Sequence, residues 1–305
     1  MPAVRPRIEP LAFSRAPSLA ISIIVVVQAI DESLQATLVD LREARLPLSY
    51  EVILVVASED ASRLVALRQD FPLLLVYQAS PGTSLGGLYD IGIRAAGGRH
   101  LLLLDGSARP TSSAVQDMVR FADGGQWIGA VVPRYVTEQG QDRPSCRFFP
   151  TPLSACREAL GGHPLVPRLH YAFNRLVTTP KEIDAAEGGC VLIRRAAMLD
   201  VGGMAAAYPA GGEMWDWCMR AKLKGWGIFL HPGSEAVLCD PTQQQPPMVR
   251  RESIRRFVYR FYGWLPTVLV TCLMVPFELK DRVLFRKRVR KKRPERPVEK
   301  ALPAC

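Results

Sequence analysis

The sequence has 305 residues and 48% hydrophobic content, a composition typical of a globular protein with room for one α/β domain and an appendage. Its net charge is +10, but residues 280–300 alone hold eleven Lys or Arg against three Asp or Glu, a net +8. The rest carries only +2, which argues against a nucleic-acid-binding domain. Seven cysteines without a C-x-x-C pair argue against a disulfide framework or a zinc cluster and favour a reducing cytoplasm.

The first half of the chain alternates apolar runs with segments of helical periodicity. The β-branched and apolar runs predict strands at 20–27, 51–56, 73–77 and 100–104. Helices are predicted at 34–45, at 61–69 and between the glycine-rich turn at 82–87 and residue 97. This alternation predicts right-handed βαβ units and a mostly parallel sheet flanked by helices, preceded by an irregular lead at 1–17.

The second half has a weaker pattern. Residues 133–186 are rich in Pro, Arg and aromatic residues, and we expect an irregular, partly helical insertion there. Strands are predicted at 189–193 and 227–230, and helices at 196–201 and 213–224, the last one ending at Gly225. The α/β domain is thus expected over residues 18–245.

The C-terminal region, 246–305, combines an apolar run with a basic tail. Residues 263–277 carry no charge, but they number fifteen and include Pro266 and Pro276, whereas a membrane-spanning helix needs about 20 residues. An interfacial or re-entrant element followed by Lys and Arg is the pattern of a protein bound to an anionic membrane surface, here the inner face of the cell membrane. A nucleic-acid contact through the tail alone, or a solvated tail, are the alternatives.

Candidate chemical groups follow the strands, because ligands of open α/β sheets bind beyond the carboxyl ends of the strands. Asp105 follows an apolar strand and can ligate a divalent cation, although Asp-Gly is also a common turn. Glu213 and Asp216 lie three residues apart at a helix start, where they share a face. They can divide acid and base roles, or they can simply favour the helix N-terminus.

Ser58 and Asp60 follow the second predicted strand. Their side chains can contact a nucleotide base or ribose, and the same residue types also favour the N-cap of a helix. Three tryptophans, Trp215, Trp217 and Trp226, can stack on a sugar ring or belong to the core, and core packing is the preferred interpretation.

Two stretches carry a resemblance to a known family. GGCVLIRRAAMLDVGGM (188–204) and EMWDWCMRAKLKGWGIFLHP (213–232) resemble segments of the family 2 glycosyltransferases, in which Glu-Asp-x-Asp-Leu-Cys-x-Arg is followed by Gly-Trp. The resemblance extends from about residue 20 to 237. It implies a nucleotide-diphospho-sugar transferase (GT-A) fold, and inverting transfer of a sugar from a nucleotide donor to a glycan or lipid-linked acceptor. It also implies a Mg²⁺ or Mn²⁺ ion at Asp105, with Glu213 or Asp216 as the base.

Several positions depart from the family pattern. Val56 stands in place of an Asp that contacts the nucleotide, Ser107 replaces the second Asp of the metal motif, and Met214 replaces the usual base. Cys239 lies near the place of a common His, and Gln28-Ala29 replaces Tyr-Asn. The sequence therefore leaves two hypotheses open: an active transferase in polysaccharide or glycolipid biosynthesis, and a catalytically impaired relative that binds protein partners of a glycan assembly system.

Overall fold

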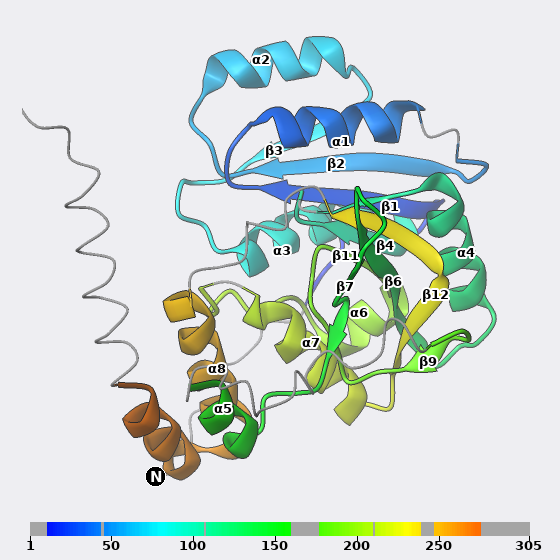
Figure 1. Cartoon of the computed structure of the whole chain (residues 1–305). Coiled ribbons are helices and arrows are strands. Elements are labelled where there is room, and N and C mark those ends of the chain that lie inside the picture. Colours follow the sequence, from blue (N-terminus) through cyan, green and yellow to red (C-terminus); the bar gives the residue numbers. More distant parts are fainter. Residues whose placement is uncertain are drawn as a thin grey trace, which may run out of the picture.

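A computed structural model describes residues 11–43, 46–106, 108–159, 177–209, 211–238 and 247–275. Its centre is a mixed β-sheet with the strand order β3-β2-β1-β4-β11-β6-β12-β5 (Figure 1). In chain order these strands are β1 (Leu19–Val27), β2 (Tyr50–Val56), β3 (Leu75–Gln78), β4 (Gly98–Leu104), β5 (Ala108–Pro110), β6 (Ile128–Thr137), β11 (Cys190–Arg194) and β12 (Gly227–Leu238). Two short strands, β7 (Asp142–Arg143) and β9 (Lys181–Glu182), extend this sheet, while β8 (Cys146–Arg147) pairs separately with β10 (Ala185–Ala186).

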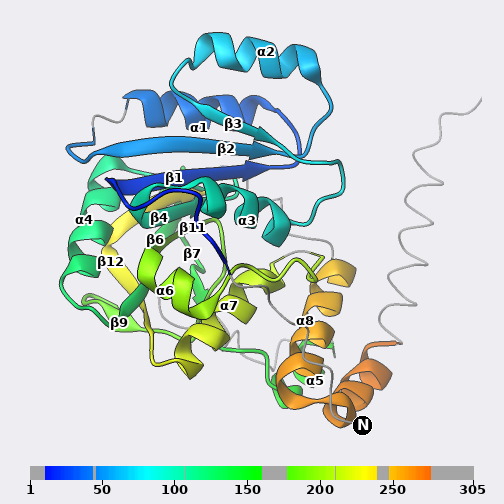
Figure 2. The ribbon, with the colours of Figure 1, turned by 180° about the vertical axis from the view of Figure 1, so that it is seen from behind.

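Helices cover both faces of the sheet (Figures 1 and 2). Successive strand residues point to opposite faces, so Ile23 and Val25 join one core cluster and Ile24 and Val26 join the other. The first face packs against α1 (Glu32–Glu43), α2 (Ala61–Asp70) and α4 (Ser112–Asp123). The second packs against α3 (Leu85–Ala95), α5 (Pro152–Ala159), α6 (Arg195–Val201), α7 (Gly212–Leu223) and α8 (Pro247–Tyr262).

The α/β fold class predicted from the sequence is confirmed, and the parallel pattern is strongest in the first half. Strands β3, β2, β1 and β4 are parallel neighbours, as the βαβ alternation predicts. Beyond β4 the sheet is mixed, because β11 enters antiparallel between β4 and β6, whereas β6 and β12 run parallel to each other.

Two predictions about the second half were wrong for the same reason. Strand β6 continues through Pro133 to Thr137, into the segment expected to be irregular, and β12 continues past the expected end at Leu230 to Leu238. Pro133 pairs with His231 at the point where the register shifts to Glu235. A proline lacks the N–H that a sheet interior requires, and a β-bulge is one of the few places where a strand accepts it. Helix α4 and strands β5 and β6 were not predicted.

The C-terminal helices belong to the same core as the domain. Ile254, Phe257 and Val258 of α8 are fully buried in the cluster on the second face, together with Val270 and Met274 from a following helical stretch at 264–275. Within the described residues, no helix is long and apolar enough to cross a membrane. The expected boundary at 245 and the basic tail at 280–300 lie outside the described residues.

The start of β4 provides a test of how closely the sheet is packed. A Cβ atom at Gly98 would lie 2.4 Å from the backbone nitrogen of Ser22 in β1, whereas one at the neighbouring Gly97 would meet nothing closer than 3.4 Å. We expect Gly98→Ala to lower the free energy of unfolding by about 1–3 kcal/mol in urea denaturation, because a rigid backbone has to shift. Gly97→Ala is the matched control and should change it much less; equal effects would contradict the packing described.

Candidate active site

Asp105 lies immediately beyond the carboxyl end of β4, in the middle of the sheet. Its backbone N–H donates a hydrogen bond to the carbonyl of Gly189 (3.3 Å), which continues the pairing of β4 with β11. Gly188 has a positive φ of 97°, and a Cβ atom there would lie 3.9 Å from the Asp105 carboxylate. The glycine backbone thus lies against one side of this carboxylate.

Glu213 lies in the first turn of α7 and is only 2% exposed. Burial raises the pKa of its carboxyl group from 4.5 to about 7, backbone N–H groups at the helix start oppose this rise, and the negative charge of Asp105 adds to it. The Oε2 atom has no hydrogen-bond partner among the described residues. The structure thus brings Glu213 and Asp105, two residues singled out in the sequence, within electrostatic reach of each other.

Tyr89 of α3 lies within the electrostatic reach of these two carboxyl groups. It was not identified as a site residue from the sequence. Its side chain is 2% exposed, and burial, then the charges of Asp105 and Glu213, raise the pKa of its hydroxyl well above the usual value. A tyrosine in a helix with apolar neighbours is indistinguishable from an ordinary core residue, so the sequence held no signal for it.

Asp216 has a different environment, although it lies one turn from Glu213. It is fully buried, and its carboxylate accepts hydrogen bonds from Arg220 (2.7 Å) and Tyr208 (3.2 Å) and pairs with Arg260 of α8 (2.8 Å). Arg220 also donates to the carbonyls of Val201 and Gly203, at the end of α6. Asp216 therefore sits in a compensated ion network that connects α7 to α6 and α8.

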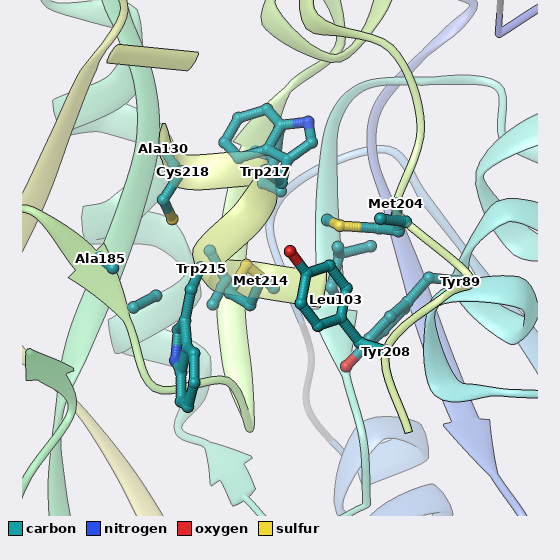
Figure 3. Close-up of a cluster of buried hydrophobic side chains, with 14 of the residues drawn as sticks. Tyr89, Leu103, Ala130, Ala185, Met204, Tyr208, Met214, Trp215, Trp217 and Cys218 are labelled. Carbon is teal, nitrogen blue, oxygen red and sulfur yellow. The ribbon is translucent and has the colours of Figure 1, made fainter. Parts of the chain in front are cut away.

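The neighbouring residues of α7 belong to the core. Met214, Trp215 and Trp217 are at most 2% exposed, and Figure 3 shows them among buried apolar and aromatic side chains that include Tyr208. The Arg147 guanidinium lies 4.1 Å from the Trp215 ring centroid. Core packing, the interpretation preferred from the sequence, fits the positions of Trp215 and Trp217. Val56, at the end of β2, is also fully buried, whereas Ser107 and Cys239 lie outside the described residues.

Ser58 and Asp60 follow β2, two strands away from β4, a separation of about 10 Å. Asp60 caps α2 by accepting a hydrogen bond from the N–H of Arg63 (3.1 Å), and its own N–H donates to the Ser58 hydroxyl (3.2 Å). Hydrogen bonds from Ser62 and Arg63 lower the pKa of Asp60. The two residues are exposed or half-exposed at the same edge of the sheet as Asp105, but no described contact joins them to it.

The described residues contain no cluster of three or more His, Cys, Asp or Glu side chains able to hold a metal ion. Mg²⁺ and Mn²⁺ sites in nucleotide-dependent enzymes commonly use one or two carboxylates, with substrate phosphates as further ligands. Asp105, directly after β4, fits as the carboxylate of a site of that kind. The unpartnered, buried Oε2 of Glu213 is consistent with a group that a ligand completes.

Comparison with solved structures identifies the fold. No family model and no curated protein sequence matches the chain. Among solved structures, GalNAc-T7 in complex with UDP, GalNAc and Mn²⁺ superimposes with a TM-score of 0.58 at 17% identity, over 81% of this chain and 49% of the other, so this chain spans about half of that protein's length. Residues 1–349 of TarS from S. aureus superimpose with a TM-score of 0.51 at 14% identity, over 84% and 69%. Both are GT-A-type glycosyltransferases, and the chain shares their fold.

Removal of the Asp216 charge tests the ion network. Asp216→Asn leaves two arginines without their buried counter-charge, and we expect it to lower the free energy of unfolding by about 3 kcal/mol or more. Asp200→Asn is the control, since Asp200 pairs with Lys224 at a site that is 47% exposed; exposed pairs contribute at most about 1 kcal/mol. Comparable losses in both variants would show that the network does not hold α7 in place.

The raised pKa of Glu213 predicts a stability that depends on pH. Between pH 4.5 and about 7 the folded protein keeps a proton that the unfolded chain releases, so this group's contribution to stability is lost as the pH rises through that window. Glu213→Gln has no such titration. We expect it to match the wild type near pH 4.5 and to be more stable by about 1–3 kcal/mol at pH 8 in urea denaturation.

The control for that experiment is Glu182→Gln, at an exposed carboxylate paired with Lys222. Its stability difference from the wild type should stay flat over the same pH range. A Glu213→Gln variant that is less stable than the wild type at pH 8 would show that the ionised carboxylate is stabilised by partners.

Proposed function

We propose that this protein is a glycosyltransferase that moves a sugar from a nucleotide-diphosphate donor to an acceptor hydroxyl group with inversion at the anomeric carbon. The fold is compatible with many chemistries, so the proposal rests on the site. The observation that carries it is Glu213, a buried carboxyl group whose Oε2 has no hydrogen-bond partner among the described residues. Burial and the charge of Asp105, which follows β4 in this GT-A fold, raise its pKa to about 7.

Asp105 is proposed to hold a divalent cation on the donor side. GalNAc-T7, which shares the fold, was crystallised with UDP and Mn²⁺. A bound Mg²⁺ or Mn²⁺ would neutralise the charge of the diphosphate leaving group. Gly188 carries no side chain on the side of Asp105, where a Cβ atom would lie 3.9 Å from the carboxylate. Ser58 and Asp60, at the same sheet edge, are proposed to contact the nucleoside.

Glu213 is proposed as the general base. A pKa close to the working pH lets a carboxylate accept a proton in the transition state and release it afterwards. The Glu213 carboxylate would take the proton of the acceptor hydroxyl as its oxygen bonds to the anomeric carbon, while the bond to the diphosphate breaks and the nucleoside diphosphate leaves. Asp216 is not available as the base, because its two carboxylate oxygens are paired with Arg220 and Arg260. This assignment compensates for Met214, whose buried thioether cannot accept the proton.

The two buried apolar substitutions favour a second candidate function. Val56 and Met214 are packed in the core at positions where the family resemblance implies carboxylates. A chain that kept the fold and lost the chemistry would act as a binding partner in polysaccharide or glycolipid assembly. The two functions differ in nucleotide binding, which the first experiment measures.

Calorimetric titration of the full chain with UDP, GDP and dTDP, with and without Mn²⁺, tests the donor site. We expect one of the nucleotides to bind in a metal-dependent manner, and Asp105→Asn to weaken that binding by about tenfold or more, since a metal ligand is removed. Glu182→Gln should leave it unchanged. No binding of any nucleotide would favour the partner function and move the search to proteins.

Release of nucleoside diphosphate from a panel of nucleotide sugars and acceptors then tests the base. Glu213→Gln should retain nucleotide binding and lose turnover by at least about 100-fold, the range of general base catalysis. In the wild type, turnover should rise with pH as Glu213 loses its proton. A cation bound at Asp105 would offset the negative charge that raises this pKa, so we expect the rise to be centred below about 7. Undiminished turnover in Glu213→Gln would exclude this residue as the base.

A further inference from the structure

The helical stretch at 264–275 is apolar on two sides. Its inner side contributes Val270 and Met274, which are fully buried in the domain core. Its outer side exposes Trp264 (63%), Leu265 (66%), Val268 (52%), Leu269 (57%) and Val275 (43%), and Cys272 is exposed on the same side. Positions 264, 265, 268, 269, 272 and 275 follow helical spacing, so they form one continuous stripe, named here the outer apolar face.

The threonine hydroxyls of this stretch are already satisfied. No charged residue occurs from 263 to 277. The hydroxyls of Thr267 and Thr271 donate hydrogen bonds to the carbonyls of Gly263 and Thr267, four residues earlier, at 2.7 Å each. Hydroxyls bonded within their own helix have no need of water. The outer apolar face thus has the chemistry of a surface that enters a water-poor environment.

The aromatic residues and the positive charge next to the outer apolar face indicate which environment this face enters. Tyr259 and Tyr262 of α8 are 43% and 39% exposed and precede Trp264, and such amphipathic aromatic residues favour the boundary between lipid and water. The sequence beyond the face carries a net charge of +8 over residues 280–300, which complements a negatively charged surface. A protein partner would need a patch that is both apolar and strongly acidic, whereas an anionic bilayer supplies both properties at once.

We propose that the outer apolar face binds the surface of an anionic lipid bilayer, with the helix lying along the interface. The orientation follows from Val270 and Met274: one side of the helix is held in the protein core, so only the opposite side can enter the lipid. This inference does not depend on the proposed glycosyl transfer, since it uses neither Asp105 nor Glu213.

Co-sedimentation with lipid vesicles tests the proposal on the full chain. We expect binding to vesicles of phosphatidylcholine mixed with phosphatidylglycerol, and weaker binding to phosphatidylcholine alone. Leu265→Glu combined with Leu269→Glu should lower partitioning into the mixed vesicles by about tenfold or more. The control is Leu73→Glu, at a leucine that is 92% exposed in the turn before β3 and should leave binding unchanged. Thermal unfolding followed by circular dichroism shows that each variant is folded.

A second measurement reports on insertion of the face. Fluorescence of the wild type should be quenched by vesicles that contain brominated acyl chains, because Trp264 enters the lipid. Trp264→Phe keeps an apolar side chain, so this variant should still bind while most of the quenching disappears.

Three outcomes would overturn the proposal. They are absence of vesicle binding by the full chain, equal binding by the double glutamate variant, and quenching that is unchanged in Trp264→Phe. A lipid-free dimer that the double glutamate variant dissociates would instead assign the face to a second copy of the chain.

Discussion

Burial of negative charge on α7 is the constraint on which the site depends. The first turns of this helix carry Glu213 and Asp216 into the interior, where an isolated carboxylate is strongly disfavoured. The two buried carboxyl groups are accommodated in different ways. Two arginines neutralise Asp216 and thereby fasten α6, α7 and α8 together, whereas Glu213 meets burial and the nearby charge of Asp105, and its pKa rises. The same helix therefore supplies both a rigid support and a titratable group.

This division of roles also connects stability with function. A carboxyl group with a raised pKa destabilises the folded protein at neutral pH, and the surrounding framework has to compensate for that cost. Met214, Trp215 and Trp217 of the same helix are packed in the core, and apolar burial of this kind stabilises the fold against that cost. Met214, next to Glu213 in the sequence, adds apolar burial and no second titratable group.

Much of the fold was predictable from local sequence, and the failures have physical causes. Continuous apolar runs predicted β1, β2 and β4 because strands buried on both faces require them. Strand β6 was not predicted, and β12 was predicted to end at Leu230, because Pro133 and Pro232 indicate interrupted strands. Only the pairing of the two strands shows the bulge that accommodates these prolines. The site was half predictable: position after a strand or at a helix start indicated Asp105 and Glu213. The partner Arg260 lies 44 positions after Asp216, and no local pattern announces such a contact.

The bond between Arg260 and Asp216 has one more consequence. Asp216 contributes to the raised pKa of Glu213, and Arg260, on α8, offsets part of that negative charge. A displacement of α8 that lengthened this bond would expose Glu213 to more of the field of Asp216 and would raise its pKa further. Residue 260 lies two positions before the last residue of α8, and the outer helical stretch begins soon after. A tilt of the outer helical stretch that moved Arg260 away from Asp216 would therefore change the proton affinity of Glu213.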